Sequence, residues 1–238
     1  MKKNVISRAR LALVAAAVFA AFTPVQAPAT VTGDLQLFMS PPEQKPRRQF
    51  YSLKSLDTEN GKVAELRIYD EIGFWGVTAK GFIDELHAVA ADAAEVIVAV
   101  NSPGGDVFDA FAIYNALRRY AGKVTARVDG VAASAASLIV MAGDKIVMPE
   151  NAMMMIHNPW TIAVGTAADM RKTAEMMDKA RDGIVSAYRA KSKQEDAEII
   201  RMMDEETWMT ALEAQALGFA DVIEEPVKLA ATVRTGEL

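Results

Sequence analysis

The sequence contains no cysteine and only two histidines, His87 and His157. Without cysteine the chain has no disulfide framework, no thiolate nucleophile and no cysteine-ligated metal site. Two histidines are also too few for a histidine-rich zinc centre. The sequence therefore predicts a protein without a metal site, and we expect no cofactor.

Positive charge and nucleotide-binding loops are scarce as well. The chain carries 26 Lys and Arg against 31 Asp and Glu, a net charge of −5. This balance disfavours nucleic acid or an anionic membrane surface as the main partner. One compact basic cluster, Lys45-Pro46-Arg47-Arg48, lies in a proline-rich stretch and is interpreted as solvated linker. No GxxxxGK[ST] segment occurs, so this sequence does not encode a P-loop motor.

The N-terminus has the three-part form of a secretory signal peptide over residues 1–29. Basic residues precede the apolar run 11–22, and the small-x-small site Ala27-Pro28-Ala29 follows it. The run is short for a membrane span, and we expect no integral membrane segment. The alternatives are an upstream start codon chosen in error and a disordered arm. Residues 30–49 are predicted to be a flexible linker, and 227–238 a C-terminal tail.

Between these tails, residues 50–226 are predicted to form one α/β domain. The segment "EVIVAVNS" (95–102) is a nearly continuous apolar run, as expected for a strand buried on both faces. Other strands are expected at 64–70, 123–130, 144–150 and 152–159, and helices at 81–90, 107–121, 134–142 and 166–192. A short helix, a stop at Gly218 and a strand fill 210–225. Alternation of strands and helices indicates a largely parallel sheet.

The segment "NSPGGD" (101–106) follows the buried strand and precedes a helix. Adjacent glycines adopt backbone angles that other residues resist, which leaves N–H groups free to point outward. With the helix N-terminus behind them, Gly104 and Gly105 could hold a phosphate or the oxyanion of an acyl-transfer intermediate. A simple tight turn between strand and helix is the alternative.

Two serines stand among small residues in "ARVDGVAASAAS" (126–137). Ser134 is a candidate nucleophile, because its alanine neighbours allow a peptide to approach and the Ala135 N–H is a candidate oxyanion donor. The alternative is that Ser134 caps the following helix. Ser137, one turn further on, is a competing candidate that we expect to pack inside the helix.

A serine nucleophile needs a base. His157 lies 157 − 134 = 23 residues after Ser134, at the end of an apolar strand where parallel sheets host their sites. A histidine that merely caps that strand is the alternative, and His87 is expected on a helix surface. Candidates for an acid that orients the base are Asp204, Glu205 and Glu206, which otherwise form a charged helix N-terminus or loop.

Four motifs in order resemble the Clp-type serine peptidase family over roughly residues 60–225. They are "VNSPGG" (100–105), "GVAAS" (130–134), "MIHNP" (155–159) and "TALEAQALGFAD" (210–221). The variants "YDEIGFWGVTAKGFIDEL" and "EETWMTALEA" resemble the phage and prophage branch, the Clp-related head maturation proteases. The resemblance implies a crotonase-like spiral of ββα units with a projecting handle helix, which 166–192 fits.

The resemblance also implies roles for individual residues. Ser134 becomes the nucleophile and His157 the general base, with the N–H groups of Gly105 and Ala135 as oxyanion donors. The family's acid is an aspartate, but the matching position here is Glu206, so Asp204 stays as the alternative. The family assembles homo-oligomeric rings through the handle helix, and encloses its active sites in a chamber that admits unfolded polypeptides.

Three functions therefore compete at this point. The first is a serine endopeptidase of the Clp proteolytic-subunit type, trimming scaffold or capsid proteins during phage head assembly in the cytoplasm. The second is a crotonase-type acyl-CoA enzyme, which shares the spiral fold and the oxyanion corner. The third is a catalytically inactive structural ring protein, with Glu206 as the mark of a decayed triad.

Overall fold

The computed structural model describes residues 54–58 and 61–225, with side chains described for 61–225. All of these residues belong to one structural unit, Arg48–Leu238. The signal-peptide-like segment 1–29, the linker 30–49 and the tail 227–238 lie outside the described residues, so these predictions and the domain boundaries 50–226 stay predictions. Among the described helices, none is both long enough and apolar enough to cross a bilayer.

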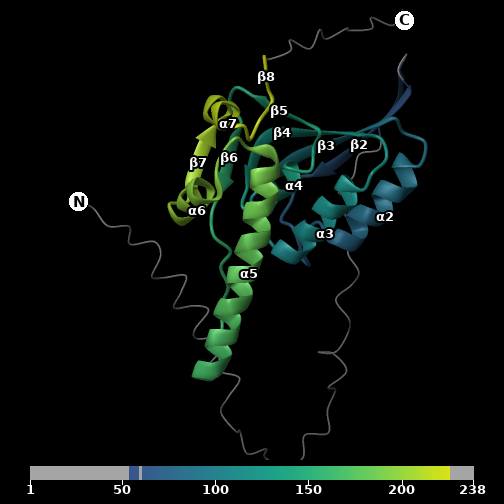
Figure 1. Cartoon of the computed structure of the whole chain (residues 1–238). Coiled ribbons are helices and arrows are strands. Elements are labelled where there is room, and N and C mark those ends of the chain that lie inside the picture. The colour runs from purple at the N-terminus through teal and green to yellow at the C-terminus, as the bar shows by residue number, and fades with distance from the viewer. Residues whose placement is uncertain (1–53, 59–60, 226–238) are drawn as a thin grey trace, which may run out of the picture. The chain divides into compact units, whose positions relative to one another are not determined.

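A mixed, mainly parallel sheet forms the centre of the molecule (Figure 1). Its strand order is β1-β2-β3-β4-β5-β8, with β6 and β7 branching from β4. β1 pairs with β2 in antiparallel register, whereas β2 to β5 and β8 run parallel. The strands are β1 Lys54–Thr58, β2 Gly61–Ile68, β3 Glu95–Ser102, β4 Lys123–Ala133, β5 Lys145–Pro149, β6 Met153–Ile156, β7 Thr207–Thr210 and β8 Val222–Glu224.

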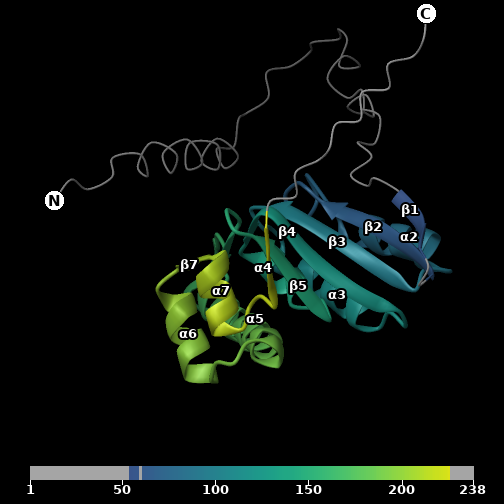
Figure 2. The same ribbon diagram turned by 90° about the horizontal axis from the view of Figure 1, so that it is seen from above.

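Two amphipathic helices cover one face of this sheet (Figure 2). The helices of the described residues are α2 Ala79–Ala90, α3 Val107–Arg118, α4 Ala135–Val140, α5 Ala167–Lys191, α6 Asp196–Asp204 and α7 Ala211–Leu217. α2 buries Phe82 and Leu86, and α3 buries Ile113 and Leu117, against the apolar side chains of β2, β3 and β4. Burial of each such side chain contributes roughly 1.5–3 kcal/mol. The α/β fold with a parallel core is confirmed and is consistent with a Clp/crotonase-type fold.

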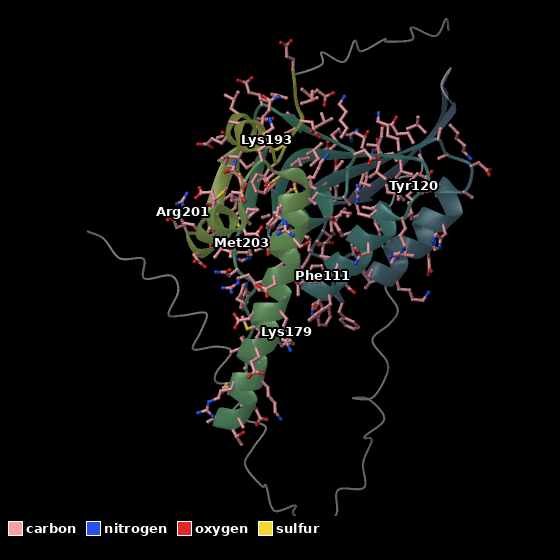
Figure 3. The ribbon with its side chains drawn as sticks, viewed as in Figure 1. Phe111, Tyr120, Lys179, Lys193, Arg201 and Met203 are labelled. Carbon is pink, nitrogen blue, oxygen red and sulfur yellow. The ribbon has the colours of Figure 1, made fainter. Side chains whose placement is uncertain are left out.

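Helix α5 has two different halves. Its C-terminal half packs into the core through Ile184, Val185 and Tyr188, and a Cβ on Gly183 would lie 2.9 Å from the ring of Phe111 on α3. Its N-terminal half projects from the body and carries Lys179 near the point of departure (Figure 3). A capping box between Thr166 and Asp169 closes its first turn. The predicted helix 166–192 is thus both a core helix and a projecting handle.

Methionines mark the projecting half of α5. Met170 and Met176 are 38% and 43% exposed. Exposed methionines add little to the stability of a helix. Their flexible thioether side chains suit an adaptable contact with another protein surface.

Most predicted elements are found within a few residues of their expected ends. The predicted helix 107–121 ends earlier, at Arg118, and the predicted strand 123–130 continues to Ala133. The sequence did not indicate β1, α6 or β7. β1 and β7 are only 5 and 4 residues long, and α6, which buries Ile199, Met202 and Met203, is only 9 residues long. The extension of β4 matters for function, because it brings the sheet to the residue before Ser134.

Candidate active site

Ser134 occupies the sharp turn between β4 and α4. Its backbone has φ 55 and ψ −127, a conformation that L-residues adopt only at a cost of about 1–3 kcal/mol. Its side chain makes no capping hydrogen bond to α4, although it occupies the N-cap position. The helix-cap interpretation of its hydroxyl is therefore wrong, and the strained turn holds the hydroxyl out of the helix.

His157 directly follows β6, and its Nε2 lies 2.7 Å from Ser134 Oγ. The sheet closes the 23-residue gap, because β6 pairs in parallel with the end of β4 and Met155 lies opposite Ala133. The Ser134 N–H also donates to the Met155 carbonyl at 2.9 Å. The imidazole side chain is 17% exposed, so it is mostly shielded from water. His87, by contrast, lies exposed on α2, as expected.

Glu206 is the acid that faces His157. β7 pairs with β6 in antiparallel register, with Ile156 opposite Thr207, so the next residues along are His157 and Glu206. The carboxylate Oε2 lies 3.9 Å from His157 Nδ1, too far for a hydrogen bond, and the side chain is 59% exposed. Glu206 also has a positive φ of 51, and it shares this property with Ser134 alone among the described non-glycine residues.

The other two acids point to different partners. Asp204 accepts a hydrogen bond from the Asn158 amide at 2.7 Å, and Glu205 binds Arg201 at 2.5 Å. All three acids lie at the C-terminal end of α6, not at a helix N-terminus. Arg201, on the outer side of α6 in Figure 3, forms ion pairs with Glu205 and with Glu198. Within the described residues, only Glu206 of the three candidates approaches the imidazole.

The glycine pair after β3 packs directly against the Ser134 turn. Gly104 has φ 99, and a Cβ there would lie 2.6 Å from the Ser134 Cβ. Gly105 has φ 144 and bridges to Ile72, a contact that uses the Gly104 carbonyl and the Asp106 N–H. The segment is therefore more than a simple turn. Gly104 approaches Ser134 and Gly105 approaches Ile72 so closely that both positions require glycine.

The N–H groups of Gly105 and Ala135 make no hydrogen bonds within the described part of the chain. Both residues line the same cleft as Ser134. Asp106 caps α3 through the N–H groups of Phe108 and Asp109, so its carboxylate is occupied. Two backbone donors beside a hydroxyl form an arrangement suited to an oxyanion.

Ser137 is buried one turn into α4, as expected. Its hydroxyl donates to the Ser134 carbonyl at 2.6 Å and lies 2.7 Å from the Tyr188 hydroxyl. Burial holds the pKa of Tyr188 well above its usual value, which the hydrogen bond to Ser137 only partly opposes. Tyr188 is thus a neutral phenol and cannot serve Ser137 as a base.

A cleft of about 460 Å³ lies over Ser134 and His157. Its walls are mainly apolar and come from α3, α4, α5 and the loop after β6; they include Phe108, Leu138, Trp160, Met176, Met177 and Ile184. In the described residues, no cluster of three or more His, Asp or Glu side chains has a geometry that could hold a metal ion. Because its walls are mainly apolar and it opens over Ser134, the cleft can bring an extended, partly apolar substrate to the serine.

Comparison with known proteins gives a consistent result. The family model for Clp protease matches residues 65–226. The chain is 36% identical over 138 residues to the ATP-dependent Clp protease proteolytic subunit of Chara vulgaris, covering 56% of this chain and 63% of the relative. It is 34% identical over 133 residues to the ATP-dependent Clp protease proteolytic subunit 1 of Protochlamydia amoebophila, covering 54% and 64%.

A third relative is the ATP-dependent Clp protease proteolytic subunit of Pinus contorta, 32% identical over 135 residues that cover 55% of this chain and 65% of the relative. The chain thus spans somewhat less than two thirds of the length of these three relatives. The family model, however, matches well over half of this chain and includes the Gly-Gly corner, Ser134, His157 and Glu206. The chain belongs to the Clp protease family.

Proposed function

We propose that this chain is a serine endopeptidase in which Ser134 is the nucleophile and His157 the general base. The observation that carries the proposal is the 2.7 Å contact between Ser134 Oγ and His157 Nε2, on a strained turn beside two unbonded N–H groups. A strained backbone at a packed site persists only where the surroundings enforce it.

The reaction follows from this geometry. His157 Nε2 accepts the Ser134 proton as Oγ attacks the peptide carbonyl carbon, and the carbonyl oxygen becomes an oxyanion. The N–H groups of Gly105 and Ala135 donate to that oxyanion, and losing one such donor typically costs about 3 kcal/mol of barrier. The imidazolium then gives its proton to the leaving amine, and water hydrolyses the acyl-serine ester.

Glu206 is the proposed third member of the triad, and Asp204 is set aside because it binds Asn158. A glutamate carboxylate stabilises the imidazolium through charge and orients the ring. Its 3.9 Å separation and its exposure make this contribution smaller than in a buried, hydrogen-bonded acid.

The proposal extends to substrate and assembly. Polypeptides are the proposed substrates, and the projecting half of α5 is the proposed contact between homo-oligomeric rings. The relatives are named as subunits of ATP-dependent proteases. This chain has no P-loop sequence, so a separate unfoldase would have to supply any ATP-driven step. The motif variants at 69–86 and 205–214 favour trimming of scaffold or capsid proteins during phage head maturation as the biological role.

Cytoplasmic action is proposed on the same resemblance, in tension with the signal-like residues 1–29. N-terminal sequencing of the purified protein decides between them. A start at Met1 or at a downstream methionine agrees with cytoplasmic action, and cleavage near Ala29 indicates export.

Hydrolysis of fluorogenic peptides tests the enzyme class. The parent protein should cleave them, Ser134→Ala should reduce the rate by roughly 10⁴-fold or more, as His157→Ala should, and Ser137→Ala should change it by less than about threefold. Turnover of acyl-CoA thioesters that survives Ser134→Ala would instead support the crotonase-type reaction. An assembled parent protein without either activity would support a structural ring.

A further inference from the structure

We propose that Trp208 is a positioning residue, whose indole N–H holds the Glu206 carboxylate against His157. The inference deepens the proposed peptidase function and rests on it. Trp208 Nε1 lies 3.4 Å from Glu206 Oε1, while Oε2 of the same carboxylate faces His157 Nδ1 at 3.9 Å. The two carboxylate oxygens are thus divided between an indole donor and the imidazole.

Strand geometry brings the three side chains together. Glu206 immediately precedes β7, on a turn with φ 51, and Trp208 is the second residue of that strand, so the turn brings the carboxylate to the indole N–H. Across the strand pair, Trp208 lies opposite Met155, whose carbonyl accepts the Ser134 N–H. The Trp208–Met155 pair therefore lies two residues along the ladder from the position of Glu206 and His157.

Glu206 needs such a restraint more than a short, buried acid would. Its side chain has three rotatable bonds and is 59% exposed, so an unrestrained carboxylate would spend little time facing the imidazole. Within the described residues, Trp208 is the one side chain that donates a hydrogen bond to this carboxylate.

The indole is suited to this task. It has a single N–H donor on a rigid ring with two side-chain torsions, and about half of the Trp208 residue is covered by its surroundings. A fixed donor on one carboxylate oxygen fixes the direction of the other. The acid arm of the site therefore consists of two residues, Glu206 and Trp208.

Steady-state kinetics with a fluorogenic peptide tests the role. Trp208→Phe keeps an aromatic ring and removes the N–H, and we expect kcat to fall roughly three- to tenfold with KM unchanged within about twofold. In a Glu206→Ala background the same substitution should cause no further loss, because its effect passes through Glu206. Trp75→Phe removes an indole N–H from a residue that is 83% exposed elsewhere and should leave kcat unchanged.

Two kinetic outcomes would overturn the proposal. One is an unchanged kcat in Trp208→Phe. The other is an equal loss in the parent and Glu206→Ala backgrounds, which would indicate packing rather than positioning. In either case hydrolysis by the parent would still support the peptidase function, so the two failures are distinguishable.

Fluorine NMR tests the contact without activity. The chain has three tryptophans, so 5-fluorotryptophan labelling gives one signal for each of Trp75, Trp160 and Trp208. Glu206→Ala should shift the Trp208 signal, assigned by its loss in Trp208→Phe, and leave the Trp75 signal in place. An unmoved Trp208 signal would show that the indole and the carboxylate do not interact, and would overturn the proposal even in an inactive protein.

Discussion

The two halves of the site are built very differently. Ser134 and His157 lie 2.7 Å apart at the ends of β4 and β6, with the Gly104–Gly105 corner packed against the serine turn. Glu206 stands on a turn between α6 and β7, exposed to solvent and 3.9 Å from the imidazole. One half is fixed by the sheet and by backbone contacts, whereas the other is held by a long side chain.

This difference indicates how catalytic work is divided. In the proposed mechanism, proton transfer between Ser134 and His157 needs a short, maintained contact, and the enclosed half provides one. Orientation of the imidazole tolerates a longer and screened contact, because the β6–β7 register already fixes the position of His157. Substitutions in the enclosed half should therefore have much larger effects than substitutions at the acid.

The largest effect is expected for His157→Ala. Without the imidazole nothing accepts the Ser134 proton, and kcat for peptide hydrolysis should fall by roughly 10⁴-fold or more. A far-UV circular dichroism spectrum like that of the parent would show that the fold is intact. A variant that kept a tenth of the parent rate would remove His157 from the mechanism.

Gly104→Ala should have the next largest effect. A Cβ would lie 2.6 Å from the Ser134 Cβ and 2.7 Å from the Ala133 carbonyl oxygen, at a φ of 99 that disfavours alanine. We expect the free energy of unfolding to fall by about 2–4 kcal/mol and kcat by at least about tenfold, measured by urea denaturation and peptide hydrolysis.

Gly165→Ala is the matched control for this substitution. Its Cβ would approach the Asp169 side chain in the capping box of α5, far from Ser134, so we expect a loss of about 1–2 kcal/mol in the free energy of unfolding and no change in kcat. Equal effects at the two glycines would mean that the corner is not specially packed against the serine.

Glu206→Ala should be milder than His157→Ala by at least two orders of magnitude. Because the carboxylate is exposed and 3.9 Å from Nδ1, we expect kcat to fall roughly ten- to a hundredfold at low salt. The rate should be measured alongside Asp204→Ala, which removes the hydrogen bond to Asn158 instead. A larger loss in Asp204→Ala would reverse the assignment of the acid.

The smallest effect on rate is expected for Tyr188→Phe. The substitution removes a buried hydroxyl that lies 2.7 Å from Ser137 Oγ, and should lower the free energy of unfolding by about 1 kcal/mol. Peptide hydrolysis should stay within about threefold of the parent, because Ser137 keeps its bond to the Ser134 carbonyl. A hundredfold loss would place this buried pair inside the catalytic machinery.

Local sequence patterns predict the strands and helices that carry the enclosed half of the site, but not the contacts between them. The buried strand 95–102, the helix after it and the left-handed stop at Gly218 follow from local patterns, and the structure has them. Ser134 is indicated by its small neighbours at the start of a predicted helix, and His157 by its place at the end of a predicted strand. Their 2.7 Å contact depends on the β4–β6 pairing, which no local pattern specifies.

The acid was harder to identify for a physical reason. Three acids occur in a row, and the choice among them depends on the β6–β7 register and on the positive φ of Glu206. α6 and β7 are only 9 and 4 residues long, too short for their patterns to fix where each element begins and ends. Trp208 gave no signal at all, because a half-exposed tryptophan on a short strand has no predictable hydrogen-bond partner.

Reaction with a fluorophosphonate, followed by peptide mapping, tests the central claim most directly. The reagent phosphonylates only a serine hydroxyl that an adjacent base activates. We predict one adduct per chain, located on Ser134 and absent from His157→Ala. An adduct on Ser137, or none on the folded and assembled parent protein, would contradict the account.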